Sequence, residues 1–481
     1  MSINRSNSKL RFNIVASSIY QLVATIVPII TIPYITRIFI VEQIGSYNLS
    51  YSIVVFLSLI SKFGIDTYGV REISKASNIT DRDQIYFNLF SIQLVNSLIL
   101  FLLCNLIFYI FFDNISSSLA MTQSLLILVN ILDISWFFIG IEAISKIILR
   151  NIVTKILSTA LIFLLVNESN QLSMYALINI LGIFLGNLVM VWASLSIVNY
   201  NNISINFSLI HLKNSFKLFI PKVLNNSYNT IDKSLIEYLS TTTNVGFYSE
   251  GQKFIKILFS VIEQAFNAIS PRMSYYIANN EIIEVKKIFK KSLEYCIIFS
   301  TIMTSGILGL SEYFVDFFYG DGYSGVASVL NILSIALIIV PINGLITSGL
   351  VVPLSKDKIY RNSTISMILM GMLFLLILVP QYGAFGASIA YVFSQLSMLI
   401  YLSWSLKNII NFKSIVTSVL KIIILVIINI SIINLLKYNI NFENSFISFI
   451  FFGCISVGIN CIYFLVNGTL KFWISKLALK W

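Results

Sequence analysis

Charged side chains are scarce in this chain, and their scarcity excludes an ordinary water-soluble protein. Only 11% of the 481 residues are Asp, Glu, Lys or Arg, whereas a soluble domain contains about 25%. Hydrophobic residues make up 57% of the chain, and the mean hydropathy is +0.86. So few charges cannot cover the surface of a chain of this length, so we expect it to lie in a lipid bilayer.

Histidine and cysteine are too few for a transition-metal site. His211 is the single histidine, and the four cysteines lie in apolar segments without C-x-x-C spacing. We expect Cys104, Cys296, Cys454 and Cys461 to be reduced, buried, small apolar residues. The sequence therefore predicts no metal site and no cofactor.

Motifs for catalysis and for secretion are also missing. There is no G-x-x-x-x-G-K-[ST] motif and no catalytic constellation, so we expect neither ATP hydrolysis nor enzyme activity. Arg5, Lys9 and Arg11 precede an apolar run that is too long for a signal peptide and has no A-x-A cleavage site. We expect the first hydrophobic segment to remain as a helix.

Long apolar runs fill the rest of the chain. A membrane span needs about 20 mostly apolar residues, and polar breaks such as FDNISSS and NESNQ separate fourteen such runs. The predicted spans are 12–39, 45–70, 86–112, 118–141, 145–166, 172–198, 215–239, 246–271, 291–311, 326–350, 361–380, 384–406, 414–437 and 445–467. The sequence thus predicts an all-α integral membrane protein.

The connections between these runs alternate in charge. Of the 32 basic residues, 24 fall in the termini and in every second connection, including 142–155 with Lys146, Arg150 and Lys155. The other connections contain a single basic residue, Lys437. Basic residues collect on the cytoplasmic side of a membrane. This pattern predicts about fourteen helices with both termini in the cytoplasm, and it explains the net charge of +11 without a nucleic-acid partner.

Two parts of the chain resemble each other. The segment IGSYNLSYS (44–52) matches VGFYSEGQK (245–253), and each opens the second span of its half. Such repeats are typical of transporters built from two related lobes. We therefore predict a six-helix lobe at 1–200, a second at 201–408, and two further helices in 409–481, with a central cavity between the lobes.

The seven basic residues outside these connections lie inside predicted spans, where charge is unfavourable by roughly 2.5–3.5 kcal/mol at the bilayer centre. Six of them are in the first, second, seventh and eighth spans. They are Arg37, Lys62, Lys222, Lys233, Lys253 and Lys256, with Lys421 elsewhere. Lys421 can reach the cytoplasmic interface as a snorkelling side chain, and Arg37 can serve as an interfacial anchor.

The eighth span carries a polar stripe. Lys253, Lys256, Ser260, Glu263 and Asn267 are spaced three or four residues apart, so they share one helix face. Such a face lines a water-filled cavity or forms internal salt bridges. We favour the cavity, because Glu263 is too deep to reach the interface.

The seventh and second spans have polar faces of their own. Lys222 starts a stripe that continues through three asparagines to Asp232 and Lys233, which is also compatible with polar helix packing. Lys62 and Asp66 are four residues apart and can form an ion pair with a structural or a functional role. Asp133 has no partner that the sequence identifies, and we expect Trp136 with its two following phenylalanines to face lipid or core.

These stripes together predict a cavity with a positive lining that suits an anionic substrate. The candidate substrate-binding residues are Arg37, Lys62, Arg71, Lys222, Lys233, Lys253 and Lys256. Embedded carboxylates can couple transport to protons or sodium. The candidates for this role are Asp66, Asp232 and Glu263.

Several longer segments of the sequence resemble those of one transporter family. They are ITRIFIVEQIGSYNLSYSI, FGIDTYGVREISK, DISWFFIGIEAISKIILRNIVTK, LFIPKVLNNSYNTIDKSLIEYLS, VGFYSEGQK, ISPRMS, PLSKDK and QYGAFGASIAYVFSQ. In order and spacing they resemble bacterial lipid-linked oligosaccharide flippases (Wzx-type) of the multidrug/oligosaccharidyl-lipid/polysaccharide exporter superfamily. The resemblance covers nearly the whole chain and rests on the order and spacing of these segments rather than on a single motif.

The resemblance implies a multi-pass protein of the bacterial cytoplasmic membrane. It would flip oligosaccharide repeat units linked to undecaprenyl pyrophosphate, for O-antigen or capsule synthesis, by alternating access driven by an ion gradient. Membrane lipids, a polysaccharide polymerase and a chain-length regulator are the implied partners. Arg71, in the YGVRE motif, would meet a pyrophosphate or an anionic lipid.

Two other functions remain open on sequence grounds. A cation-coupled drug exporter of the same superfamily would prefer an acidic, aromatic cavity, whereas these spans are net basic. A polysaccharide polymerase or ligase would carry a large external loop, whereas the longest external connection here is about fifteen residues, near 311–325.

Overall fold

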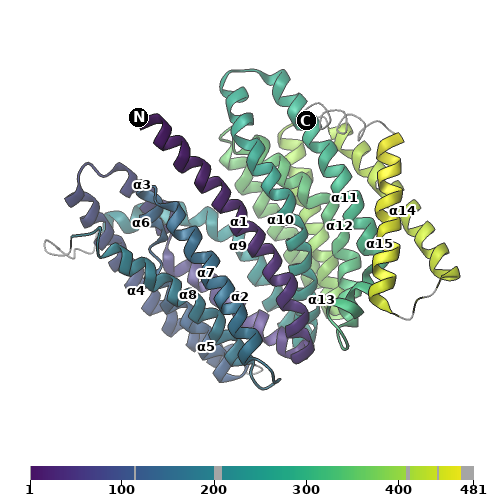
Figure 1. Ribbon diagram of the computed structural model, residues 1–481, viewed down its shortest axis with the longest axis horizontal. Helices are drawn as coiled ribbons and strands as arrows, with labels where there is room; N and C mark the ends of the chain where they lie inside the picture. Colours follow the sequence, from purple (N-terminus) through teal and green to yellow (C-terminus); the bar gives the residue numbers. More distant parts are fainter. Residues whose placement is uncertain are drawn as a thin grey trace. The chain divides into compact units, whose positions relative to one another are not determined.

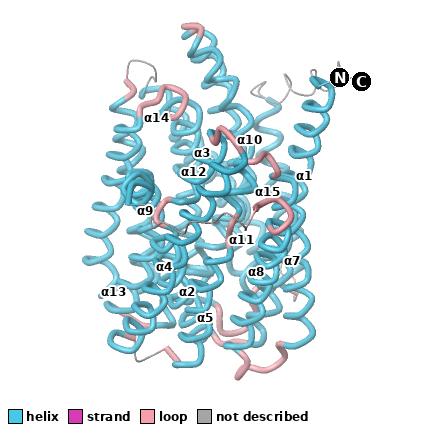
Figure 2. The backbone as a smooth tube through the Cα atoms, turned by 90° about the vertical axis from the view of Figure 1, so that its left-hand side faces the viewer, coloured by secondary structure: helices cyan, strands magenta, loops and turns pink. Residues whose placement is uncertain are grey.

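The computed structural model describes residues 2–112, 115–199, 209–407, 412–440, 442 and 444–466 (Figure 1). Within these ranges every regular element is a helix, and short loops join the helices (Figure 2). The predicted all-α class is confirmed. The chain divides into two compact units, Met1–Ser234 and Leu235–Trp481, with the boundary inside helix α9 (Leu209–Leu239). The division predicted at residues 200 and 408 stays a prediction.

Eleven helical segments among the described residues are long and apolar enough to cross a membrane. The multi-pass architecture is therefore confirmed. Helices α9 and α10 (Thr242–Ala278), which carry the polar stripes, are not among the eleven, and the predicted spans 361–380 and 384–406 both lie within α13 (Asp357–Ser405). The count of fourteen and the side of the termini stay predictions.

The first unit is a bundle in which neighbouring helices pack in a row from α1 through α7, α8 and α5 to α2 and α4. Its helices, besides the part of α9 up to Ser234, are α1 (Ser2–Ile38), α2 (Val41–Lys62), α3 (Ile65–Lys75), α4 (Ile79–Phe111), α5 (Ser117–Val129), the 3-10 turn η1 (Asn130–Leu132), α6 (Ser135–Gly140), α7 (Ile144–Leu165) and α8 (Leu172–Ser194). Side chains cap the starts of several helices. The Asn78 side chain accepts a hydrogen bond from Asp81 N (2.7 Å) at the start of α4.

The α7–α8 contact depends on two small residues. Gly182 and Gly186 on α8 face Ser158, Thr154 and the methylenes of Arg150 on α7, where a Cβ would collide with these atoms. Glycines spaced four apart allow two membrane helices to approach closely. At this close contact the Arg150 side chain of α7 reaches Asn187 of α8.

The second unit is built around α11 (Ile282–Phe318) and α12 (Ser324–Ile346), which pack against each other and against α10. The π-helical turn η2 (Thr347–Val351) extends α12, and α13, α14 (Phe412–Asn439) and α15 (Ser445–Val466) complete the unit. Helices α14 and α15 pack on α11. A buried polar network joins the three, because Asn460 Nδ2 donates to Ser305 Oγ (3.0 Å) and Asn429 Nδ2 donates to Ser456 O (3.1 Å).

Helix α13 consists of two helices that meet at Gly383. This glycine has φ +52° and ψ −127°, a conformation that residues with a Cβ rarely adopt. Asn244 of α10 braces the break, since Ala384 N donates to Asn244 Oδ1 (3.1 Å), and a Cβ on Gly383 would lie 2.6 Å from Asn244 Nδ2. The QYGAFG sequence thus encodes a sharp turn between two helical arms.

The cysteine prediction is correct in one part and wrong in another. All four thiols are free, and Cys104 and Cys296 are buried as expected. Cys454 is exposed and Cys461 is partly exposed on α15. A small apolar thiol is compatible with a lipid environment as well as with a protein core.

Candidate functional site

A break between α5 and α6 exposes Asp133 at the centre of the first unit. The helix stops at Val129, continues as the 3-10 turn η1, and resumes at Ser135, so several backbone carbonyls lack helical partners. Side chains of other helices satisfy them. The buried Gln93 of α4 donates to Asn130 O and to Asp133 O (3.1 Å), and Asn187 Nδ2 of α8 donates to Val129 O (3.1 Å). Irregular backbone at membrane depth needs such partners.

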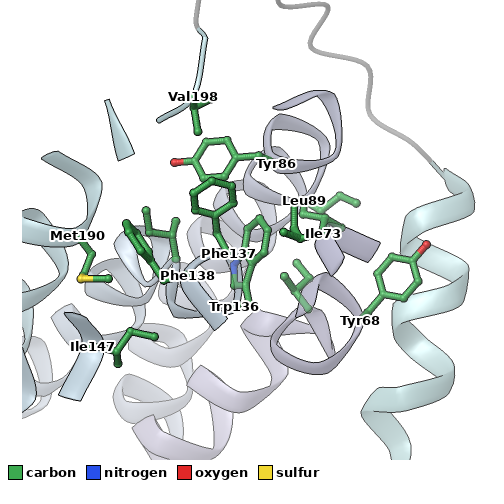
Figure 3. Packing of buried hydrophobic residues seen from close by; sticks show 13 residues of the cluster. Tyr68, Ile73, Tyr86, Leu89, Trp136, Phe137, Phe138, Ile147, Met190 and Val198 are labelled. Carbon is green, nitrogen blue, oxygen red and sulfur yellow. The ribbon is translucent and has the colours of Figure 1, made fainter. Parts of the chain in front are cut away.

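An aromatic cluster holds this break in place (Figure 3). Trp136, Phe137 and Phe138 of α6 are buried. The rings of Trp136 and Phe137 contact Tyr86 of α4, and the Phe138 ring packs edge-on against Phe137. Trp136 Nε1 also donates to Gln93 Oε1 (3.2 Å), which fixes the amide that binds the broken backbone. The aromatic residues that the sequence allowed to face either lipid or core therefore belong to the core, and they position Asp133.

Asp133 forms an ion pair with Lys62 of α2. The distance from Lys62 Nζ to Asp133 Oδ2 is 2.5 Å, and that from Lys62 Nζ to Asp66 Oδ1 is 3.5 Å. The second carboxylate oxygen of Asp133 accepts from Ser135 N (3.2 Å) and Oγ (2.5 Å). The Lys62 and Asp133 side chains are only 16% and 19% exposed. The ion pair expected between Lys62 and Asp66 is thus present, and Asp133 is a stronger, unpredicted partner.

A pocket of about 320 Å³ opens beside this ion pair, and we call it the Lys62 pocket. Its polar lining residues come from α2, α3, η1 and α9. The residues that matter here are Tyr51, Ser58, Lys62, Asp66, Thr230 and Lys233. Thr230 fixes α9 on this side, because its hydroxyl donates to Ser52 O (3.1 Å). The pocket thus unites the predicted residues Lys62, Asp66 and Lys233 within the first unit.

A second pocket of about 360 Å³ lies between α1, α2, α5, α7 and α8, and we call it the Arg150 pocket. Its lining includes Tyr20, Tyr51, Gln123, Arg150, Lys155 and Asn179. Tyr51 and Leu126 line both pockets, so the two are neighbours. No Asp or Glu is among the described residues that line the Arg150 pocket.

The Arg150 guanidinium is held by neutral oxygens. Its Nη1 donates to Asn187 Oδ1 (2.9 Å), and its Nε and Nη2 donate to Asn151 Oδ1 (3.0 and 2.8 Å). A longer contact joins Nη2 to Ser135 Oγ (3.5 Å), the hydroxyl that also donates to Asp133. Arg150 and Asp133 are therefore connected through Ser135, without a direct salt bridge among the described residues.

The second unit has a charged cluster on α10. Lys253 Nζ lies 2.8 Å from Glu250 Oε1, and the Glu250 side chain is only 2% exposed. Lys256 Nζ donates to Gln252 Oε1 (3.0 Å), and Gln252 Nε2 donates to Tyr248 Oη (3.1 Å). Lys253 therefore takes part in an internal salt bridge, one of the two readings that its stripe allowed.

Two tyrosines in the turn after α11 close over Glu250. The Tyr319 hydroxyl donates to Glu250 O (3.2 Å), and its ring stacks on Tyr323. Burial raises the pKa of both phenols, and the nearby Glu250 carboxylate raises them further. Both tyrosines therefore remain neutral hydrogen-bond donors at physiological pH.

The other predicted site residues are scattered. Arg37 is exposed near the end of α1 and donates to Pro33 O (2.6 Å), while Arg71 is exposed on α3. Asp232 is buried on α9, with Oδ1 accepting from Lys233 N (2.7 Å), and Glu263 is exposed on α10. The side chain of Lys222, like the three asparagines of its stripe, lies outside the described residues. The predicted roles of all these residues stay predictions.

Sequence reasoning missed Arg150, Lys155, Gln123 and Glu250. The two cations were assigned to a cytoplasmic connection, whereas both lie on α7 and line a pocket. The signal available in the sequence was that both cations fall within the predicted span 145–166. Glu250 lies three residues before Lys253, a spacing that permits a helical ion pair. No group of three metal-ligating side chains occurs in the described part of the chain.

The chain is similar to a known protein family and to proteins with assigned names. A family described as "Polysaccharide biosynthesis protein" matches residues 10–277. The chain is 21% identical over 393 residues to a Shigella dysenteriae protein named "Putative O-antigen transporter", across 79% of this chain and 96% of that one. A protein of the same name from Escherichia coli (strain K12) is 21% identical over 401 residues, across 82% and 95% of the two chains.

Solved structures share the fold. Lipid II flippase MurJ in an inward closed conformation superposes with a TM-score of 0.71 at 14% identity, over 97% of this chain and 99% of that one. An inward-facing multidrug resistance MATE family transporter of the MOP superfamily gives a TM-score of 0.59 at 13% identity, over 80% and 98%. At these identities the likeness concerns the fold alone.

Proposed function

The chain belongs to the polysaccharide biosynthesis protein family, and we propose from this premise that it flips lipid-linked oligosaccharide units across the membrane. It is a multi-pass protein of the bacterial inner membrane. The cargo in this proposal is a surface-polysaccharide repeat unit on undecaprenyl pyrophosphate. Its sugars and pyrophosphate cannot cross hydrocarbon unaided, so a polar path through protein is required.

One observation carries the proposal: two pockets whose linings include lysine or arginine side chains lie inside a unit built largely from apolar membrane helices. Buried ionisable groups are rare in membrane spans and mark substrate or ion pathways. The names of the two curated relatives and the fold shared with a lipid II flippase agree with this use of the pockets.

The finer parts of the proposal concern mechanism. In it, fourteen helices form two lobes with both termini in the cytoplasm, and the lobes alternate access to the two membrane faces. Asp66, Asp232 and Glu263 couple the movement to an ion gradient, and Arg37, Arg71, Lys222, Lys233, Lys253 and Lys256 add to the positive lining with Lys62. A polymerase and a chain-length regulator receive the flipped unit.

The test uses a deletion strain of the native host. Spheroplasts are treated with an impermeant sugar-modifying reagent, which reports the membrane face on which single lipid-linked units accumulate. Units trapped on the cytoplasmic face support a flippase. Units displayed on the outer face would indicate a polymerase or ligase defect, and normal surface polymer with altered drug sensitivity would indicate a small-molecule exporter.

A further inference from the structure

The lining of the Arg150 pocket contains two cations, Arg150 and Lys155. The hydrogen bonds of Arg150 go to amide and hydroxyl oxygens, and the Lys155 ammonium makes no hydrogen bond or ion pair among the described residues. Since the described lining also lacks Asp and Glu, the pocket is positive. A partly desolvated cation favours a bound anion, whose oxygens accept charge-assisted hydrogen bonds from it.

The same pocket contains an acceptor that lacks a donor. Gln123 of α5 is 1% exposed, and its Nε2 donates to Tyr47 O (3.2 Å). Its Oε1 has no hydrogen-bond partner among the described residues, although Gln123 lines the pocket. A buried acceptor is satisfied by a donor such as a hydroxyl.

Aromatic rings and neutral amides make up much of the remaining polar wall. Tyr47 and Tyr51 lie nearly parallel with ring centroids 5.9 Å apart, and Tyr20 faces the same space from α1. Asn179 of α8 adds an amide, which can both donate and accept. Flat aromatic faces suit the C–H faces of a ring, while amides suit its hydroxyls.

We propose that the Arg150 pocket is a subsite for an acidic sugar of the transported glycan. This inference rests on the proposed function. The carboxylate of the sugar binds Arg150 and Lys155, a ring hydroxyl donates to Gln123 Oε1, and the tyrosines cover the ring. The volume of about 360 Å³ lies at the small end of ligand sites, which are about 300–1,000 Å³, so it suits one or two rings.

Other parts of a glycolipid fit the pocket less well. An ionised pyrophosphate has no hydroxyl to donate to Gln123, and it does not use the tyrosine faces. A polyprenyl chain would leave the Lys155 ammonium without a polar partner. The combination of two cations, an unpaired acceptor and aromatic rings therefore favours an anionic, hydroxylated ring.

The test compares two probes that differ only in one carboxylate. Polyprenyl pyrophosphate carrying a single glucuronate, or a single glucose, is titrated against the full-length protein in nanodiscs. The wild type is expected to bind the glucuronyl probe roughly tenfold tighter, as a charge-assisted hydrogen bond predicts. Lys155→Gln is expected to remove this preference and Lys155→Arg to retain it, while Lys358→Gln, at an exposed lysine of α13, should match the wild type.

A second variant keeps the inference testable if Lys155→Gln folds poorly. Gln123→Glu preserves the side-chain shape and adds a negative charge, so it should reverse the preference in favour of the glucosyl probe. Equal wild-type affinity for both probes would overturn the subsite while leaving flipping intact. An equal loss of both affinities in Lys155→Gln would assign the pocket to the pyrophosphate. Failure of the wild type to bind either probe would instead count against the proposed function itself.

Discussion

The two pockets of the first unit have similar volumes, but they differ in the groups that surround their cations. In the Lys62 pocket, Lys62 lies between Asp133 and Asp66, so its charge is already compensated inside the protein. In the Arg150 pocket, Arg150 and Lys155 face amides and tyrosines, and their charge is left for a ligand. Counting cations in membrane spans therefore does not locate an anion site. The partners of each cation decide whether it holds the fold or binds cargo.

Asp133 is the residue on which this difference depends. It neutralises Lys62 directly and reaches Arg150 only through Ser135. The break between α5 and α6 sets this geometry, and Gln93 with the aromatic cluster of α6 sets the break. A change at Asp133 should thus affect the fold first.

The largest effect is expected from Asp133→Asn. Removing one partner of a buried ion pair typically destabilises by about 3–5 kcal/mol, and the partial exposure of this pair suggests about 3 kcal/mol. Asp66→Asn, at a longer i,i+4 distance, should lower stability by less than about 1 kcal/mol. Thermal unfolding in detergent measures both. Equal losses would show that Lys62 does not distinguish its two carboxylates.

Gly383→Ala tests whether a loss of stability in the second unit changes ligand preference at the Arg150 pocket of the first unit. The positive φ and the contact with Asn244 leave no room for a Cβ, so we expect a loss of about 1–3 kcal/mol in the second unit. The preference between the two sugar probes should persist in the protein that remains folded. A lost preference would mean that the probes report general stability rather than the Arg150 pocket.

Substitutions of Lys155 and of Lys62 should have different effects on transport and on folding. Lys155→Gln should leave the amount of folded protein near wild type and lower flipping of an acidic glycolipid by roughly tenfold. Lys62→Gln leaves two carboxylates without their cation, so it should mainly lower the amount of folded protein. Quantitative blotting alongside surface-polymer assays separates the two outcomes. A well-folded but inactive Lys62→Gln would make Lys62 a substrate-binding cation.

The smallest effect concerns the unpaired polar atoms of the pockets. Ser58 Oγ in the Lys62 pocket is buried without a hydrogen-bond partner among the described residues, so Ser58→Ala should be neutral or stabilise by up to about 1 kcal/mol. Gln123→Leu removes a donor to Tyr47 O and should destabilise by about 1 kcal/mol. Unfolding midpoints of the two variants check the contrast. A destabilising Ser58→Ala would indicate that this hydroxyl has a polar partner.

Much of the fold could be predicted from composition and periodicity. Low charge and long apolar runs require membrane helices, because a bilayer leaves the backbone few alternatives. The number of spans could not be fixed in the same way. Helices α9 and α10 carry too many polar residues for a simple apolar span, and the turn at Gly383 joins two predicted spans into one continuous element.

The candidate site was predictable only where its contacts are local. The Lys62–Asp66 pair follows from a spacing of four residues, but the Lys62–Asp133 pair joins residues 71 apart in the chain. The basic-residue pattern did not show that Arg150 and Lys155 line a pocket, because charges near a helix end look the same whether they face the cytoplasm or a pocket. Their environment depends on Gly182, Gly186 and Asn187 of another helix.

The most direct test of the account is flipping by the purified protein in proteoliposomes. An acidic lipid-linked oligosaccharide is placed in the membrane, and an impermeant glycosidase reports its arrival on the outer face over time. The account predicts that the wild type and Lys155→Arg expose the cargo far faster than protein-free liposomes do, while Lys155→Gln is roughly tenfold slower than the wild type. A wild-type rate equal to that of protein-free liposomes would contradict it.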